Sequence, residues 1–292
     1  MHIGTTGIWS PELRLHGDSG EIADAAAELD SHGWGALWIP GLGGGDILGD
    51  TERLLAATRN TTVATGVLSI WRHPAEEMAA GHARLRKEYG HRVLLGLGVS
   101  DAAAARHAAA ARHAGGTYRP LAALGTYLDR LDQAPEPVPA DERLVAAMGP
   151  KLTELAARRS AGTHPFLVTP DFTAGARAIL GPGPLLAPYQ AVVVDPRPDS
   201  ARATARGFLA PFIGMGHYAR SLLRQGFSEE DLAGGGSDRL IDSVVAWGSV
   251  DAVDERVKAH LDAGATHVAL HAISADPGLP RTQWRELAPL AR

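Results

Sequence analysis

The sequence contains no cysteine in its 292 residues and only three lysines, Lys87, Lys151 and Lys258. The absence of cysteine excludes disulfides, thiolate zinc sites, iron–sulfur clusters and cysteine nucleophiles. Two of the lysines are expected in helices and Lys151 in the first turn of a helix, which argues against a Schiff-base lysine inside a sheet. The sequence also lacks a G-x-S-x-G motif, so a nucleophile elbow is not expected.

Long apolar runs and a strong charge of one sign are also missing. No apolar stretch approaches the roughly 18 residues that span a bilayer, and the first residues, MHIGTTGIWSPELRL, show no basic segment before an apolar run. The formal charge of −5 and the pI of about 6.2 provide no basic surface for nucleic acid or an anionic membrane. We therefore expect a cytoplasmic protein whose partner is a small-molecule substrate, with no nucleic acid and no membrane.

The clearest pattern in the chain is a strand–helix–strand unit over residues 61–100. Residues 61–68 are β-branched and apolar apart from Gly66, and residues 93–98 are apolar without alternation. Between them, Pro74 can open a helix and Gly90 can end it. A strand that is apolar on both faces is typical of a parallel sheet covered by helices, which requires a right-handed crossover.

Similar units repeat along the whole chain. Strand-like segments are predicted at residues 2–8, 36–40, 61–68, 93–98, 144–148, 165–169, 190–195 and 267–271. Helices are expected between them, and a long helical insertion is expected over residues 199–247, between the seventh and eighth strands. This α/β pattern predicts one domain over residues 1–292, a (β/α)8 TIM barrel with a helical insertion. A doubly wound sheet is less favoured, because no dinucleotide fingerprint follows the first strand.

Chemistry in such a barrel belongs to the carboxyl ends of the strands, and few catalytic acids or bases are expected there. His267 and His271 could share a strand face, but no clear third ligand accompanies them, so no metal site is expected. Gly149-Pro150, between a strand and a helix, is either an anion site or a plain tight turn. Trp9, Trp38 and Trp71 either line an apolar pocket or pack in the core.

Four stretches together resemble a known family. They are ATGVLSIWRHPAEEMA, VLLGLGVS, MGPKLTELAARRSAGTHPFLVTP and DRLIDSVVAWGSVDAVDERVKAHLDAGATHVAL. Their order and spacing are similar to the luciferase-like monooxygenase superfamily, and most of all to its branch of coenzyme F420-dependent oxidoreductases. The resemblance implies a (β/α)8 barrel that binds the deazaflavin F420, or FMN, at its carboxyl end, and often a homodimer.

Carried over by position, the resemblance also implies site residues. Gly66–Val67 corresponds to a non-prolyl cis peptide that supports the back of the cofactor ring. The other implied cofactor residues are Gly98, Val99 and Ser100 at the ring or ribityl chain, and Ala147, Met148, Gly149, Pro150, Val168 and Thr169 at the chain and phosphate. The implied substrate side comprises Thr6, Gly7, Trp9, Pro40, Gly41 and Trp71.

One departure from the family pattern bears on the reaction. Pro40 and Gly41 stand where many family members carry an acidic residue and a histidine, so the usual proton donor or base is missing. Asp46 could replace it if its loop closes, or it could be an ordinary turn aspartate. Three functions follow: an F420-dependent oxidoreductase, an FMN-dependent monooxygenase, or a non-catalytic flavin-binding barrel.

Overall fold

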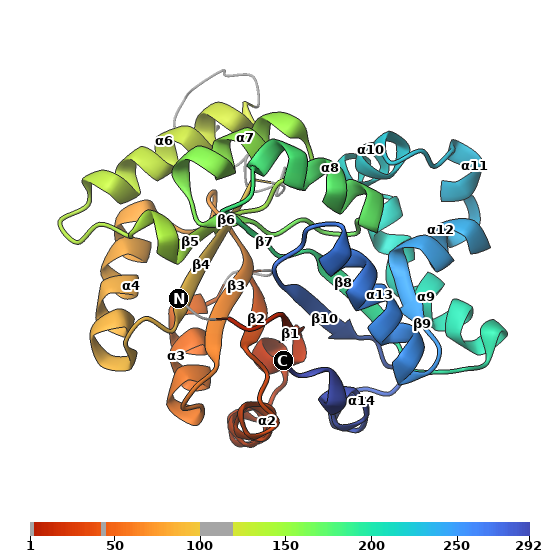
Figure 1. Cartoon of the computed structure of the whole chain (residues 1–292). Coiled ribbons are helices and arrows are strands. Elements are labelled where there is room, and N and C mark those ends of the chain that lie inside the picture. Colours follow the sequence, from red (N-terminus) through yellow and green to blue (C-terminus); the bar gives the residue numbers. More distant parts are fainter. Residues whose placement is uncertain (1–2, 42–44, 100–118) are drawn as a thin grey trace.

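The computed structural model describes residues 3–41, 45–99 and 119–292. Its centre is a curled, all-parallel sheet of ten strands in the order β7-β6-β5-β4-β3-β2-β1-β10-β8-β9, with helices on the outside (Figure 1). The strands are β1 (Thr6–Trp9), β2 (Ala36–Gly41), β3 (Thr62–Ser69), β4 (Val93–Gly98), β5 (Arg143–Val145), β6 (Gly162–Thr163), β7 (Leu185–Leu186), β8 (Tyr189–Val193), β9 (Val245–Trp247) and β10 (Val268–Ala272). The α/β architecture predicted from the sequence is confirmed.

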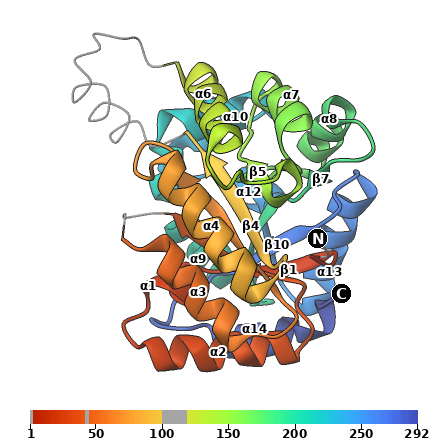
Figure 2. The same ribbon diagram turned by 90° about the vertical axis from the view of Figure 1, so that its left-hand side faces the viewer.

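The helices form a layer around this sheet, and α2, α3, α4, α6, α7, α8 and α13 each contact the next in that order (Figure 2). These helices are α2 (Ser19–Ser31), α3 (Ile47–Ala57), α4 (Ala75–Tyr89), α6 (Pro120–Gln133), α7 (Pro150–Arg159), α8 (Pro170–Leu180) and α13 (Val250–Asp262). Shorter elements are α1 (Glu12–Leu15), α14 (Arg281–Leu287), η1 (Ala140–Glu142) and η3 (Ala288–Leu290). Side-chain caps fix several helix starts: Asp18, for example, caps α2 and accepts bonds from two backbone N–H groups.

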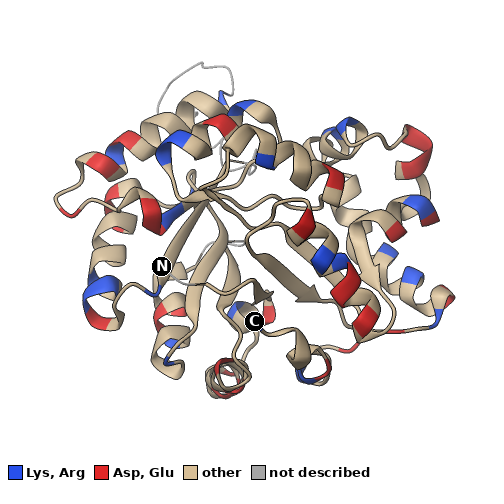
Figure 3. Ribbon diagram, in the orientation of Figure 1, with Lys and Arg blue, Asp and Glu red and all other residues tan. Residues whose placement is uncertain are grey.

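Side chains alternate between the inside and the outside of the curled sheet, as the period of a strand requires. In β2, Trp38 joins the inner cluster of buried side chains, whereas Leu37 and Ile39 join the cluster that packs against the helices. Trp38 is therefore a core residue, which is one of the two interpretations that the sequence left open. Nearly all charged residues lie on the outer helices and loops (Figure 3).

The chain between β6 and β8 hydrogen-bonds to neighbours on both of its sides. Leu186 and Ala187 pair with Thr163 of β6, and the carbonyl of the same Leu186 accepts bonds from the backbone of Thr266 and His267, just before β10. β8 continues this pairing with β10 over residues 189–192. Residues 185–193 thus connect the β6 side of the sheet to the β10 side.

The strand count and some strand positions differ from the sequence prediction. The residues predicted as the sixth strand, 165–169, are not a strand; the pairing residues come earlier, in β6. Pro165 lacks an N–H, and Leu167 has a φ of +54°, which is outside the strand region. Two short strands, β7 and β9, were not predicted; β9 falls at the end of the stretch expected to be a helical insertion.

The rest of that stretch is helical, as predicted. It comprises α9 (Pro198–Ile213), α10 (Gly216–Arg224), α11 (Glu229–Leu232), η2 (Ala233–Gly235) and α12 (Asp238–Val244). α9 packs against β8 and β9, and α10 and α12 pack against α9 (Figure 1). None of the helices in the described part of the chain is long and apolar enough to cross a membrane.

Candidate functional site

The carboxyl half of β3 leaves the regular ladder at Gly66–Val67. The register of β3 shifts against β2 between Ile39 and Gly41, and against β4 between Ala64 and Leu68. The Gly66–Val67 peptide bond is cis, as the resemblance predicted. Both residues are partly exposed, whereas residues 62–65 of the same strand are buried. The bulge therefore presents backbone to the surface at the end of the sheet where chemistry is expected.

Two glycines permit the close packing around this bulge. A Cβ atom on Gly98, the last residue of β4, would lie 2.6 Å from Val67 Cγ2. A Cβ atom on Gly41 would lie 2.3 Å from Leu68 Cα. Larger residues would push β2 or β4 away from β3, so at position 41 the chain cannot present a histidine without rearrangement. Pro40 is buried beside it, and its carbonyl accepts a bond from Arg14 Nη1 at 2.9 Å.

Two indole rings border the bulge. Trp9 ends β1, and its Nε1 donates to the carbonyl of Gly66 at 2.9 Å. Trp71 follows β3 and donates from Nε1 to the carbonyl of Val99, just after β4, at 3.1 Å. Trp71 is partly exposed and Trp9 is buried. The structure thus brings five predicted site residues together: Trp9, Gly66, Val67, Trp71 and Val99.

A second group of predicted residues lies where α7 and α8 begin. Gly149 is the N-cap of α7 and Thr169 is the N-cap of α8, whose Oγ1 accepts from the N–H of Phe172 at 3.3 Å. Pro150 is exposed, Met148 is partly exposed, and Ala147 and Val168 are buried. No atom would lie within 4 Å of a Cβ placed on Gly149, so the space beside the α7 start is open among the described residues.

The helical insertion supplies charge and anchoring at this point. Arg224 at the end of α10 donates from Nη2 to the carbonyl of Met148 at 2.9 Å, and its side chain is exposed. The neighbouring Gln225 accepts from the N–H of Thr169 at 3.0 Å and donates to the carbonyl of Leu167 at 3.2 Å. Two helix N-termini and one arginine make this edge favourable for an anion. Neither Arg224 nor Gln225 was predicted, because both lie over 50 residues away from their partners in sequence.

Below the bulge, the inside of the sheet holds a stack of rings. Trp38 stacks on His164 with centroids 4.5 Å apart, and its Nε1 donates to His267 Nε2 at 3.0 Å. His164 donates from Nδ1 to the carbonyl of Ala187 at 2.7 Å, so its Nε2 carries a lone pair, and this atom is buried without a partner among the described residues. Burial lowers the pKa values of His164 and His267 to about 4, so both rings are neutral at pH 7.

On the other side of Trp9, a histidine and a tyrosine from neighbouring strands meet. His271 Nδ1 and the Tyr189 hydroxyl lie 2.5 Å apart. Burial lowers the pKa of His271 to about 3 and raises the pKa of Tyr189 well above its ordinary value. His271 was considered from the sequence only as a metal ligand, and Tyr189 was not considered at all. In the described part of the chain, no group of three His, Cys, Asp or Glu residues is placed to hold a metal ion.

Three of the predicted residues that the structure describes do not join these groups. Thr6 begins β1, at the amino end of the sheet, and its hydroxyl donates to the carbonyl of Leu290 at 2.7 Å; the expectation that it faces a substrate is wrong. Gly7 is buried, and a Cβ there would lie 2.8 Å from His267 Nε2, below the bulge. Asp46 caps α3 by accepting from the N–H of Gly49 at 2.9 Å, which fits the ordinary turn aspartate. Ser100 lies outside the described residues.

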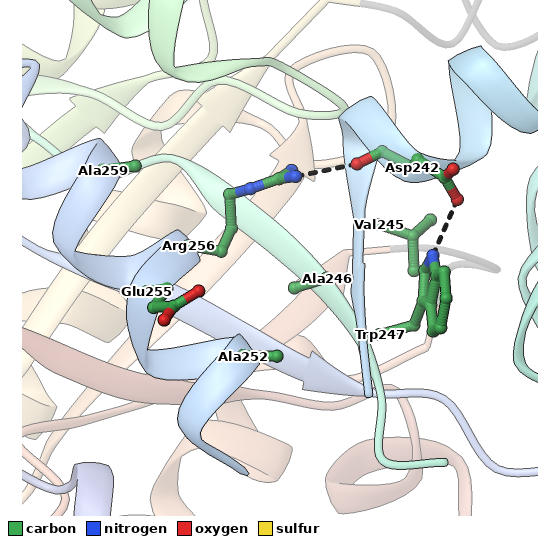
Figure 4. A pocket seen from close by; sticks show the side chains of 8 residues that line it. All are labelled: Asp242, Val245, Ala246, Trp247, Ala252, Glu255, Arg256 and Ala259. Carbon is green, nitrogen blue, oxygen red and sulfur yellow. Dashed lines mark hydrogen bonds between the residues drawn. The ribbon is translucent and has the colours of Figure 1, made fainter. Parts of the chain in front are cut away.

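Two surface cavities lie elsewhere, and neither is lined by a predicted site residue. One, of about 390 Å³, lies between α12, β9 and α13, where Trp247 and Arg256 both donate to Asp242 (Figure 4). The other, of about 470 Å³, lies near the end of α4 around His82 and Glu136. The contacts that line the first cavity connect α13 and β9 to α12, so these residues have a structural role there.

Solved structures of other proteins share the fold of this chain at low sequence identity. No protein-family model matches the sequence, and no curated protein matches it. Among solved structures, an F420-dependent secondary alcohol dehydrogenase in complex with an F420–acetone adduct is 16% identical, covers 99% of both chains and has a TM-score of 0.69. The coenzyme F420-dependent tetrahydromethanopterin reductase of Methanopyrus kandleri is 15% identical, with 99% of both chains covered and a TM-score of 0.69.

A third similar structure binds a different cofactor. It is the oxygenating constituent of 3,6-diketocamphane monooxygenase from Pseudomonas putida, in complex with FMN. It is 16% identical, with 99% of this chain and 97% of that chain covered and a TM-score of 0.71. The chain therefore shares the fold of both F420-dependent and FMN-dependent proteins, which confirms the resemblance read from the sequence at the level of the fold.

Proposed function

We propose that the protein is an oxidoreductase that binds coenzyme F420 and transfers hydride between this deazaflavin and a small organic substrate. The observation that carries the proposal is the partly exposed bulge at Gly66–Val67, at the carboxyl end of a sheet whose fold is shared with F420-dependent enzymes. The ring would lie on this backbone, flanked by Trp9, Gly98 and Val99. In the proposed enzyme, residues 185–193 act as one bent strand that closes a (β/α)8 barrel with an insertion after β8, which their hydrogen bonds to both sides support.

The residues at the second group fit the charged part of such a cofactor. The open space beside Gly149, the starts of α7 and α8, and the exposed Arg224 favour a phosphate. Met148, Pro150, Val168 and Thr169 would contact the chain that leads to it. Pro150 and Pro170 occupy the first positions of their helices and have no N–H, so Arg224 and the later amides of each first turn would hold the anion.

The deazaflavin supplies the hydride chemistry when bound, because its ring has carbon in place of flavin N5. The protein's own contribution is binding, orientation and the exclusion of water. Trp9 fixes the Gly66 carbonyl by a hydrogen bond, and the buried apolar side chains beneath the bulge keep water away from its inner side. No carboxylate or histidine is contributed by Pro40 and Gly41, so proton exchange must rely on other residues.

A cofactor titration tests the proposal. Purified protein is titrated with F420 and, in parallel, with FMN, and binding is followed by fluorescence. Micromolar binding of F420 without comparable binding of FMN is expected. FMN binding alone would replace the proposal by an FMN-dependent monooxygenase, and failure of both to bind would overturn it. Tight F420 binding without turnover on a panel of alcohols and ketones would favour a non-catalytic cofactor-binding barrel.

A matched pair of variants tests the phosphate side. Arg224→Ala is expected to weaken F420 binding about three- to ten-fold, because an exposed charge pair contributes about 1 kcal/mol. Arg220→Ala, an exposed arginine on the same helix, serves as the control and is expected to leave the affinity unchanged. Equal effects of the two substitutions would contradict a specific role for Arg224.

A further inference from the structure

The hydrogen bond between Tyr189 and His271 determines where the imidazole carries its proton. No other hydrogen bond is made by the Tyr189 hydroxyl in the part of the chain that the structure describes. If this hydroxyl accepted a proton from Nδ1, its own buried O–H would be left without an acceptor, which costs about 1–3 kcal/mol. The tyrosine must therefore donate to Nδ1, and the neutral imidazole of His271 carries its proton at Nε2.

The Nε2–H group of His271 lacks a hydrogen-bond acceptor among the described residues, yet it is not sealed from solvent as the unpartnered Nε2 of His164 is. His271 itself is 6% exposed. The imidazole of His271 is therefore fixed at Nδ1 by Tyr189, and its Nε2–H is a hydrogen-bond donor that a bound ligand could satisfy.

Aromatic rings surround this donor. The ring of Trp9 lies 4.7 Å from that of His271, and the ring of Phe208, from α9, lies 5.5 Å away, edge to face. Three further rings continue the wall, with Phe166 4.3 Å from Tyr189, Phe212 5.1 Å from Phe166, and Tyr218 5.6 Å from Phe212; all three are partly exposed. The wall joins β1 and β8 to the helical insertion, and Trp9 connects it to the bulge through Gly66.

We propose that His271 is a specificity-determining residue whose Nε2–H donates to an oxygen of the substrate, and that the substrate is a flat apolar or aromatic molecule carrying a carbonyl or similar acceptor oxygen. Flat apolar surfaces suit a wall of aromatic rings, and a single neutral donor selects a single acceptor. A cation, which aromatic faces also attract, is disfavoured because the N–H would point at it. That the bound molecule is a substrate rests on the proposed function, whereas its binding to His271 does not.

The first test reads the tautomer directly. A two-dimensional proton–nitrogen spectrum of the histidine side chains, without any cofactor, distinguishes Nε2–H from Nδ1–H, with His271→Gln used to assign the signal. We expect the Nε2–H form at both pH 6 and pH 8. In Tyr189→Phe the signal should shift toward a mixture of tautomers, since Nδ1 loses its donor. An Nδ1–H tautomer in the unaltered protein would overturn the proposal.

The second test uses two probes of matched shape, acetophenone and ethylbenzene, which differ in the acceptor oxygen. Binding is measured by calorimetry or ligand-observed NMR on the protein without cofactor. Acetophenone is expected to bind about two- to ten-fold more tightly, which is the range of one neutral hydrogen bond. His271→Phe should reduce this preference to about one-fold, while Phe212→Leu should weaken both probes equally.

The outcomes separate this inference from the proposed function. An unchanged preference in His271→Phe, or binding of neither probe, would overturn the inference whatever the F420 titration gives. If F420 fails to bind but the His271-dependent preference is present, the cofactor assignment fails and the substrate assignment stands. The tautomer measurement does not depend on a folded His271→Gln variant. The histidine signal that changes in Tyr189→Phe can be assigned to His271 by that change.

Discussion

Acid is expected to unfold this protein through its buried histidines. Burial lowers the pKa values of His164 and His267 to about 4, and those of His260 and His271 to about 3. In the unfolded chain each would titrate near pH 6.5. Well above that pH both states are neutral at these sites and no penalty exists. As the pH falls below 6.5 the unfolded state takes up protons that the folded state refuses, so stability is lost until the folded pKa is reached.

The size of the effect follows from the number of protons. Each histidine changes the free energy of unfolding by about 1.4 kcal/mol per pH unit once its unfolded form is fully protonated. Integrated from pH 6.5 to 5, with half-protonation at the start, one histidine removes about 1.6 kcal/mol and four remove about 6 kcal/mol. Domains are commonly stable by about 5–15 kcal/mol. The four histidines can therefore remove most of the stability while the carboxylates are still ionised.

The assay is urea unfolding at a series of pH values between 5 and 7.5, followed by circular dichroism. The slope of the unfolding free energy against pH near 5.5 should correspond to more than three protons. His260→Gln removes one of the titrating groups and should reduce the slope by about one proton, whatever it does to stability at pH 7. His16→Gln, at the surface beside Glu21, is the control. A slope below about one proton would refute the burial argument.

Other predictions concern single contacts. Trp38→Phe removes the donor to His267 Nε2 at 3.0 Å and should lower the free energy of unfolding by about 1–3 kcal/mol; no loss in urea unfolding would mean that another donor replaces it. Gly162→Ala should destabilise the protein severely, because φ is +150° and the added Cβ would lie 1.8 Å from a β7 carbonyl oxygen. Gly175→Ala, at a helix position with open space around it, should stabilise the protein by about 0.5–1 kcal/mol. Similar melting temperatures for the two variants would contradict this. Glu28→Gln weakens the partly exposed contacts to two arginines of α14 and should lower stability by about 1 kcal/mol in the same assay.

The sequence was a good guide wherever a strong local pattern coincided with the tertiary structure. The β3–α4–β4 unit appears almost at its predicted bounds, because β-branched runs, Pro74 and Gly90 all specify the same local structure. Residues 165–169 misled because PFLVT has high strand propensity, which describes a fit to a pleated surface and does not determine the backbone. There the carboxyl edge turns instead, and Leu167 adopts φ +54°.

The site was predictable only in part, for a related reason. Gly66 and Gly98 stand out locally as glycines near the carboxyl ends of two strands, and the resemblance to a known family added Val67 and the cis peptide bond. Tyr189 and His271 are 82 residues apart, and nothing local shows that they meet. The same holds for the rings of α9 and α10, which become a wall only after the insertion folds back over the sheet.

The insertion has a consequence for how such a protein could diversify. One continuous segment, α9 to α10, carries Phe208 beside His271 and Phe212 beside Phe208, and it also carries Arg224, which lies at the start of α7. If the proposed roles of His271 and Arg224 hold, a recombination event that exchanged this segment would alter substrate preference and cofactor affinity in one step, while leaving β3 and β4 intact. Point changes spread over the sheet would have to alter the two properties separately. The architecture thus makes the α9–α10 segment a natural unit of inheritance for new specificities.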